Sequence, residues 1–281
     1  MSGRDHITEG IGWREHAGGG PVLLALHGIG SEARAFDALA AQLPDWRVIA
    51  WEAPGYGPSD PLDKAWPVAA DYAAAALRLM DALALERVQV MGHSLGTLIG
   101  AALARAHPER LDSLTLASCA QGGGAAAGGA LPDAQAARLE DLQRQGAEAF
   151  AASRAARLIY APEENADLVA NVAQGMGKVK MPGYGQAVRM LASGDLAADC
   201  AALTVPTSVI VGGEDVVTPP VQSFRAHEAL PVAVRGALSL VPATGHALHQ
   251  QAPQALAAAI LRLQGERTLS ARWASDQGGE L

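Results

Sequence analysis

Residues 88–98, VQVMGHSLGTL, combine a short apolar run, a serine between two glycines and the start of a helical pattern. The run from Val88 to Met91 is typical of a strand that is covered on both faces. From Leu95 onward, apolar residues recur at helical spacing. Ser94 lies between these two segments, at the centre of a G-x-S-x-G motif. A serine in a tight turn between strand and helix has its hydroxyl exposed at the carboxyl edge of the sheet, so we predict that Ser94 is a nucleophile.

The neighbours of Ser94 fit that interpretation. Gly92 and Gly96 have no Cβ, so the strand and the helix can approach each other closely. The N–H of Leu95 lies at a helix N-terminus, where unpaired amides and the helix dipole favour negative charge. The motif alone also occurs by chance, because glycine and serine are ordinary turn residues. The flanking strand and helix favour the nucleophile.

Length and charge narrow the class of protein. The chain has 281 residues and a formal net charge of −8. That length suits one α/β domain with an insertion, and the acidic balance argues against nucleic acid and anionic membranes as partners. The first residues are polar, and no apolar run approaches the roughly 20 residues that a membrane span needs. We expect a cytoplasmic protein that acts on a small-molecule substrate, with homo-oligomer formation left open.

Strand and helix patterns alternate along most of the chain. The predicted strands cover residues 12–15, 22–26, 47–51, 88–91, 111–117, 207–211 and 238–241. Helical patterns lie between several of them, over residues 36–43 and 72–83 for example. This alternation predicts right-handed β-α-β units and a parallel sheet.

The alternation is interrupted in the middle of the chain. Residues 121–130 are almost entirely glycine and alanine, which predicts a flexible connection. Residues 132–200 show helical patterns only, including one helix over 139–150, and residues 175–185 resemble a glycine-rich hinge loop. We therefore assign residues 1–119 and 201–267 to an α/β core. Residues 120–200 form an inserted helical cap, and residues 268–281 form a flexible tail.

A serine hydroxyl needs a base to remove its proton and a third group to orient that base. In a parallel sheet, such groups gather at the carboxyl ends of strands. Asp215 follows the strand at 207–211, and His246 follows the strand at 238–241. Both stand in the chain order serine, acid, histidine. We predict that His246 is the base and Asp215 its orienting carboxylate, with the adjacent Glu214 as an alternative.

Two other histidines are less suited to the role of base. His93 precedes the predicted nucleophile, and we expect it to pack beneath the pocket. His249 lies three residues after His246, at the start of a helix and not at the end of a strand.

Attack by Ser94 would place negative charge on an oxygen, and preorganised donors stabilise such charge. The turn after the second predicted strand contains His27, Gly28, Ile29 and Gly30. We predict that the N–H groups of Ile29 and Leu95 form an oxyanion hole. The alternative is that the glycines serve only to make a tight turn.

The sequence contains no dinucleotide-binding or phosphate-binding glycine motif. It also contains no cluster with the spacing of metal ligands. We therefore expect chemistry without a cofactor. The two cysteines, Cys119 and Cys200, are far apart in the chain, and we expect them to be buried thiols.

Taken together, these segments resemble the α/β-hydrolase superfamily. The matching pieces are HGIG at 27–30, APGYGPS at 53–59, GHSLG at 92–96, GED at 213–215 and GH at 245–246. The resemblance implies an α/β-hydrolase fold: a mostly parallel eight-stranded sheet flanked by helices, with a helical cap after the sixth strand. It also implies a triad of Ser94, His246 and Asp215. One departure is Glu52, where many relatives carry aspartate, which leaves the floor of the pocket open.

The chain is similar to the enol-lactonase and carbon–carbon bond hydrolase branches, which act in the breakdown of aromatic compounds. We expect a hydrolase of a small carboxylic ester or lactone that works through an acyl-enzyme. A carbon–carbon bond hydrolase of a vinylogous diketone and a ligand receptor without turnover are the alternatives. Five cap cations could pair with a substrate carboxylate or lie on solvated helix faces: Arg154, Arg157, Lys178, Lys180 and Arg189.

Overall fold

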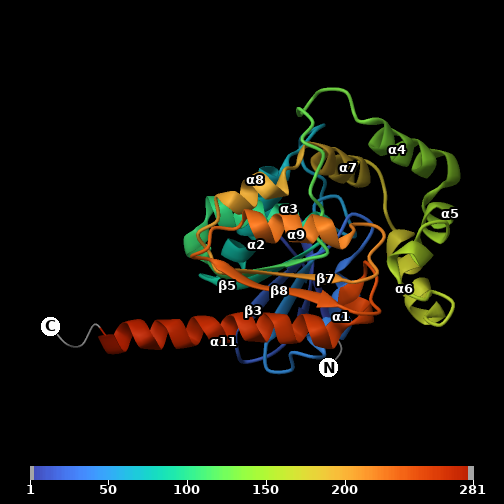
Figure 1. The fold of residues 1–281 in the computed structure, drawn as a ribbon. Coiled ribbons are helices and arrows are strands. Elements are labelled where there is room, and N and C mark those ends of the chain that lie inside the picture. The colour runs from blue at the N-terminus through green and yellow to red at the C-terminus, as the bar shows by residue number, and fades with distance from the viewer. Residues whose placement is uncertain (1–2, 278–281) are drawn as a thin grey trace.

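The computed structural model describes residues 3–277 of the chain, and its centre is one eight-stranded sheet (Figure 1). The strands are β1 Arg4–Thr8, β2 Ile11–His16, β3 Val22–Leu26, β4 Arg47–Trp51, β5 Val88–His93, β6 Leu111–Ala117, β7 Thr207–Gly212 and β8 Arg235–Val241. Their order across the sheet is β1-β2-β4-β3-β5-β6-β7-β8. The β1–β2 and β2–β4 pairs are antiparallel, and all other pairs are parallel. The predicted eight-stranded, mostly parallel sheet is confirmed.

The two ends of the sheet differ from the predicted strands. β1 was not predicted, because its sequence RDHIT is short, largely polar and mostly exposed. It forms a hairpin with β2, and both residues of the turn, Glu9 and Gly10, have positive φ angles of 51° and 71°. β8 begins at Arg235, three residues before the predicted strand at 238–241.

Helices cover both faces of the sheet (Figure 1). One face packs against α2 Ala69–Ala82, α3 Leu95–Ala106 and α9 Pro220–Ala229, and the other against α1 Asp37–Ala40, α10 Leu248–Gln251 and α11 Pro253–Gln277. Alternate residues of one strand belong to different cores: Leu24 and Leu26 to the first face, Leu23 and Ala25 to the second. Burial on both faces explains why the central strands are apolar without interruption.

Two short 3₁₀ helices complete the core, η1 Ala33–Phe36 and η2 Pro108–Arg110. The helix predicted over 36–43 therefore begins and ends three residues earlier, as η1 followed by α1. The predicted helix over 72–83 is α2, which begins three residues earlier.

The segment between β6 and β7 is helical. It contains α4 Asp133–Gln145, α5 Ala147–Ala152, η3 Ala155–Leu158, α6 Ala166–Met176, α7 Gly183–Ser193 and α8 Leu196–Ala201. We call α4 to α7 the cap. α8 lies with the core instead, against α3 and α9 (Figure 1). The single helix predicted over 139–150 is interrupted at Gly146, whose φ is 76°. The predicted loop at 175–185 is shorter, because α6 runs to Met176 and α7 starts at Gly183.

Hydrogen bonds tie together the two segments that connect the cap to the core. The N–H groups of Gly123, Gly124 and Ala125 donate to carbonyls of residues 191, 194 and 192, at 3.1, 3.0 and 2.9 Å. A Cβ on Gly122 would lie 2.0 Å from the carbonyl oxygen of Gly194. The glycine-rich segment at 121–130 contains no helix or strand, but its first half is held by these contacts.

The C-terminal segment continues the fold. α11 extends to Gln277, into the segment that we predicted as a flexible tail, and residues 278–281 lie outside the described part of the chain. Cys119 and Cys200 are buried free thiols, as predicted. No helix of the described residues combines the length and the apolar character that crossing a membrane requires.

The strand order determines where a site can form. β3 lies between β4 and β5, so the chain leaves β3 toward one side for β4 and returns on its other side as β5. In open α/β sheets, ligands bind at the carboxyl ends of strands beside such a reversal. His27 directly follows β3, and Ser94 directly follows β5.

Backbone contacts at the end of β5 leave no room for a side chain. A Cβ on Gly92 would lie 2.3 Å from the carbonyl oxygen of Gly96, and a Cβ on Gly96 would lie 2.2 Å from the carbonyl oxygen of Leu26. Both distances are below any real contact of a Cβ atom. α3 can begin directly at the end of the strand because these two residues are glycine.

Gly96→Ala should therefore lower the free energy of unfolding by about 2–4 kcal/mol, because backbone atoms must move to admit the methyl group. Gly100→Ala is the matched control on the same helix, since its nearest neighbour would be a side-chain atom, Leu114 Cδ1, at 3.1 Å. Urea unfolding measures both variants. Equal stability of the two variants would contradict the tight contact at Gly96.

Candidate active site

Ser94 has an unusual backbone conformation. Its φ is 53° and its ψ is −115°, so a residue with a side chain occupies a region that favours glycine. Its N–H donates to the Ala117 carbonyl at 2.9 Å, and its own carbonyl accepts a hydrogen bond from the Thr97 hydroxyl at 2.6 Å. The conformation is held from both sides, and it turns the side chain away from both β5 and α3.

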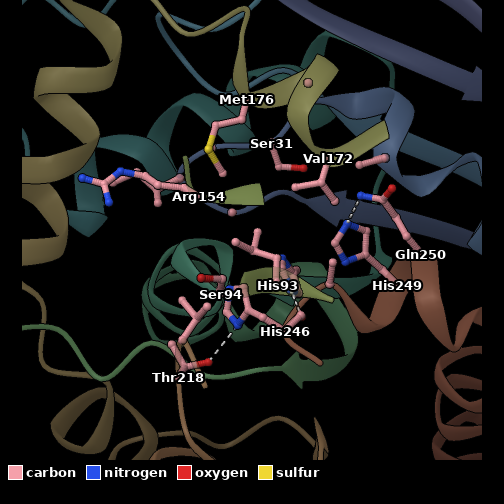
Figure 2. A pocket seen from close by; sticks show the side chains of 18 of the residues that line it. Ser31, His93, Ser94, Arg154, Val172, Met176, Thr218, His246, His249 and Gln250 are labelled. Carbon is pink, nitrogen blue, oxygen red and sulfur yellow. Dashed lines mark hydrogen bonds between the residues drawn. The ribbon is translucent and has the colours of Figure 1, made fainter. Parts of the chain in front are cut away.

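A cavity of about 680 Å³ lies between the carboxyl ends of the strands and the cap. From the core it is lined by Gly28, Ile29, Ser94 and His246, and from the cap by residues of α4, η3, α6 and α7. Figure 2 shows Ser94 and His246 on one side of the cavity, with Met176 and Val172 of α6 facing them.

Asp215 and His246 form a buried pair. The Nδ1 atom of His246 lies 2.8 Å from Oδ2 of Asp215, and the two residues are 3% and 2% exposed. The other carboxylate oxygen of Asp215 accepts hydrogen bonds from the N–H groups of Val217 and Thr218, each at 2.9 Å. The adjacent Glu214 is exposed, so of the two acidic residues only Asp215 contacts His246.

Thr218 belongs to this arrangement and was missed by the sequence analysis. Its hydroxyl lies 2.9 Å from Asp215 Oδ2, 3.1 Å from His246 Nδ1 and 3.1 Å from the Ser118 carbonyl (Figure 2). The sequence did contain a signal for Thr218. In a turn, an aspartate side chain often accepts hydrogen bonds from backbone N–H groups two or three residues later, and Thr218 is three residues after Asp215.

The environment of Asp215 favours its charged form. Burial alone would raise the pKa of this carboxyl group, but the hydrogen bond and the charge of His246, together with the N–H groups of Thr218 and Val217, hold the pKa below its ordinary value. A charged Asp215 accepts the Nδ1 proton of His246, which leaves Nε2 of the imidazole as the basic nitrogen.

The backbone of His246 is also fixed. His93 Nε2 donates to the His246 carbonyl at 2.8 Å, and the Ser118 hydroxyl donates to the same oxygen at 3.1 Å. His93 is 2% exposed and packs beside the His246 ring, with ring centroids 4.9 Å apart. This is the packing role predicted for His93.

His249 lies closer to the site than its position in the sequence indicated. Its ring centroid is 4.2 Å from that of His93, it lines the cavity, and it is 1% exposed (Figure 2). It lies at the start of the short helix α10, as expected, but the turn at His246 brings that helix to the cavity. Burial lowers the pKa of His249 well below its ordinary value, and the pKa of His93 to about 3.

His27 fixes the peptide unit before Ile29. The Ala53 N–H donates to His27 Nε2 at 3.0 Å, so the proton of the neutral ring lies on Nδ1 and donates to the Gly28 carbonyl at 2.8 Å. Burial lowers the pKa of His27 to about 4, which keeps the ring neutral. The Gly28 carbonyl and the Ile29 N–H belong to one planar peptide and point in opposite directions. His27 therefore determines where the Ile29 N–H points.

Other contacts hold this turn beside Ser94. A Cβ on Gly28 would lie 3.1 Å from the Ser94 Cβ, and the Tyr56 hydroxyl donates to the Ile29 carbonyl at 2.7 Å. Leu95 is the first residue of α3, so its N–H has no acceptor within the helix. The two amides that we predicted as an oxyanion hole thus flank the residue that carries the hydroxyl.

Glu52 lies behind this turn and is not among the residues that line the cavity. One carboxyl oxygen accepts a hydrogen bond from the Ala33 N–H at 3.1 Å, and the other lies 3.8 Å from His27 Nε2. Burial raises the pKa of Glu52 to about 7. The departure from aspartate at this position therefore lies outside the cavity lining, where the Glu52 side chain holds the Ala33 N–H.

Two of the five candidate cap cations line the cavity, Arg154 and Arg157. Lys178 is paired with Glu32 at 2.8 Å, Lys180 donates to the Gly57 carbonyl at 2.9 Å, and Arg189 donates to the Gly185 carbonyl at 2.9 Å. A further cation that the sequence analysis missed, Arg138 of α4, also lines the cavity. Within the described part of the chain, no three histidine, cysteine, aspartate or glutamate side chains are grouped as a metal site.

Comparison with known proteins identifies the family. Residues 22–259 match the sequence profile of the alpha/beta hydrolase family. The chain belongs to the alpha/beta hydrolase family. The chain is 30% identical over 240 residues to an uncharacterized protein of Mycobacterium tuberculosis, and the match spans 76% of this chain and 67% of that one.

Two further similarities are to enol-lactonases. The chain is 28% identical over 182 residues to 3-oxoadipate enol-lactonase 1 of Acinetobacter baylyi, across 64% of this chain and 65% of that one. The enol-lactonase of Burkholderia xenovorans LB400 superposes with a TM-score of 0.80 at 20% identity, over 93% of this chain and 100% of that one. The structural match shows that the fold is shared.

The buried histidines predict how stability changes with pH. The folded hydrolase keeps His249 neutral, while the unfolded chain takes up a proton below the ordinary pKa of 6.5. Unfolding then takes up a proton, so stability falls as the pH falls below that value. His249→Gln should make the decline shallower by up to about 1.4 kcal/mol per pH unit between about pH 6 and pH 5.

Urea unfolding at several pH values measures this slope, which does not depend on how much the substitution destabilises the protein at neutral pH. His107→Gln serves as a control, because the His107 side chain is 38% exposed. An unchanged slope in His249→Gln would show that His249 takes up a proton in the folded protein.

Proposed function

We propose that this alpha/beta hydrolase cleaves a small carboxylic ester or lactone through an acyl-enzyme, with Ser94 as nucleophile, His246 as base and Asp215 as the carboxylate that orients the base. The observation that carries the proposal is the buried contact of 2.8 Å between His246 and Asp215, which borders the same cavity as a serine at φ 53°. The resemblance to enol-lactonases supports the same reaction class.

The arrangement supports the following steps. Ser94 Oγ attacks the carbonyl carbon as His246 Nε2 takes its proton, and Asp215 stabilises the resulting imidazolium. The carbonyl oxygen becomes an oxyanion, and the N–H groups of Ile29 and Leu95 donate to it. The intermediate collapses, and His246 gives its proton to the leaving alkoxide. Water then attacks the acyl-enzyme with His246 again as base, and the acid and free Ser94 are released.

Ser94→Ala should reduce the turnover of p-nitrophenyl esters and γ-lactones at least about 1,000-fold, because the attacking oxygen is lost. Ser153→Ala is the control, since Ser153 is an exposed serine of the cap region outside the cavity lining. A fluorophosphonate probe should label Ser94 in the wild-type protein, and mass spectrometry of the Ser94 peptide would detect the adduct. Full ester turnover by Ser94→Ala would reject the proposed nucleophile.

The same panel separates the alternatives when vinylogous diketones are included. Turnover that depends on Ser94 and is confined to the diketones would identify carbon–carbon bond cleavage. A folded protein that is labelled at Ser94 but turns over no ester, lactone or diketone would favour a receptor.

His27 should act as a positioning residue for the oxyanion hole. His27→Ala removes the donor to Gly28, so we expect kcat for a p-nitrophenyl ester to fall about 10- to 100-fold with KM nearly unchanged. His27→Asn keeps a side-chain donor near the Nδ1 position and should recover part of the loss. Phenylboronic acid, which forms a tetrahedral adduct with an active-site serine, should bind more weakly to His27→Ala in proportion to kcat. A change in KM alone would contradict this role.

A further inference from the structure

The charged side chains on the core side of the cavity are neutralised by partners outside its lining. Glu32 is paired with Lys178 at 2.8 Å, and Asp37 is paired with Arg14 at 2.7 Å and with His16 at 2.9 Å. The remaining core cation of the lining, Arg34, is paired with Asp5. This side of the cavity therefore offers a ligand no unbalanced charge.

The cap side differs, because three arginines line it and, among the described residues, only one of them is paired with a carboxylate. Arg138 belongs to α4, Arg157 to η3, and Arg154 directly precedes η3. Arg154 is paired with Asp141 at 2.7 Å, and Asp141 is also paired with Arg144. Among the described residues, Arg138 and Arg157 have no carboxylate partner. The cap end of the cavity therefore carries an excess of positive charge.

Two of these guanidinium groups are held in place by aromatic rings. The Cζ atom of Arg154 lies 4.3 Å from the centroid of the Phe150 ring, and that of Arg138 lies 5.7 Å from the centroid of Tyr184. The two rings pack edge to face, with centroids 5.7 Å apart. Arg138 Nε also donates to the Tyr184 hydroxyl. Both side chains are thus ordered before any ligand binds, which lowers the entropic cost of binding.

The two guanidinium groups lie over the same pair of packed rings, Arg138 over Tyr184 and Arg154 over Phe150. Burial raises the pKa of Tyr184, and the positive charges of Arg138 and Arg154 both oppose that rise. Both charges are therefore near one hydroxyl group. Arg154 Nε is buried and has no hydrogen-bond partner among the described residues. Figure 2 shows Arg154 at the end of the cavity away from His249 and Gln250. The cavity lining thus offers an anion two cations, one of which has an unused hydrogen-bond donor.

We propose that Arg138 and Arg154 form a carboxylate-binding subsite, and that the substrate is an ester or lactone that carries a free carboxylate away from the bond that is cleaved. A planar guanidinium group can bind a carboxylate through two parallel hydrogen bonds, which suits arginine better than lysine for this task. The assignment of the substrate class rests on the function proposed above. The subsite itself depends only on the charges and contacts of the cap.

A matched pair of substrates tests the subsite: the p-nitrophenyl monoester of adipic acid, which ends in a carboxylate, and that of adipamic acid, which ends in a neutral amide of the same size. We expect the wild-type KM for the adipic monoester to be lower by about tenfold or more. Arg138→Gln and Arg154→Gln should each raise this KM toward that of the amide and leave the amide unchanged. Added salt should weaken only the charged substrate.

Arg144→Gln is the control variant. Arg144 lies on the same helix as Arg138 and pairs with Asp141, but its side chain is 72% exposed and outside the cavity lining. It should keep the preference for the carboxylate. Thermal unfolding of each variant verifies folding, and if one arginine variant does not fold, the other variant and the salt dependence still decide the outcome.

Calorimetry with Ser94→Ala measures binding without turnover. Adipamate, the anion, should bind at least about tenfold more tightly than adipamide, its neutral counterpart. Equal binding of the two, or equal KM values of the two esters, would overturn the subsite while leaving the hydrolase function intact. Preferential binding of adipamate without any turnover that depends on Ser94 would retain the subsite and reject the proposed function.

Discussion

The site depends on the close contact of three backbone segments at the end of β5. Gly96 lies against the carbonyl of Leu26, and Gly92 lies against that of Gly96, so the strand can pass into α3 without a loop. Ser94 lies between these two glycines and has a φ of 53°. This conformation costs about 1–3 kcal/mol for a residue with a side chain. The surrounding packing offsets this cost, and the hydroxyl is therefore fixed at the edge of the sheet.

Around this turn, polar groups that do not react hold those that are proposed to react. His93 fixes the backbone of His246, His27 fixes the peptide before Ile29, and Thr218 contacts both Asp215 and His246. Burial keeps His27 and His93 neutral, so each has one ring nitrogen that donates and one that accepts. The His27 ring uses both nitrogens and so connects two backbone segments without placing a charge beneath the cavity.

Local sequence patterns were sufficient to predict the parts of the structure that depend on local chemistry. The apolar runs at β3, β5 and β7 and the motif around Ser94 could be read directly, because burial on both faces and a glycine-flanked turn leave clear signals. β1 was missed because an exposed edge strand needs few apolar residues. The position of Arg138 could not be predicted, since it depends on how α4 lies over the sheet. His249 was placed on the correct helix but not at the cavity, because the turn at His246 decides where that helix lies.

The two connecting segments of the cap lie against each other, with hydrogen bonds from residues 123–125 to residues 191–194. Because the two ends of the insertion meet, β6 and β7 can pair as neighbours in the sheet although about 90 residues separate them in the chain. The cap also contacts the core between those ends, where Lys178 pairs with Glu32 and Gln186 donates to the carbonyls of Leu62 and Lys64. In this protein, Ser94 and His246 belong to the α/β core, while α4, η3, α6 and α7 of the inserted segment line the same cavity from the other side.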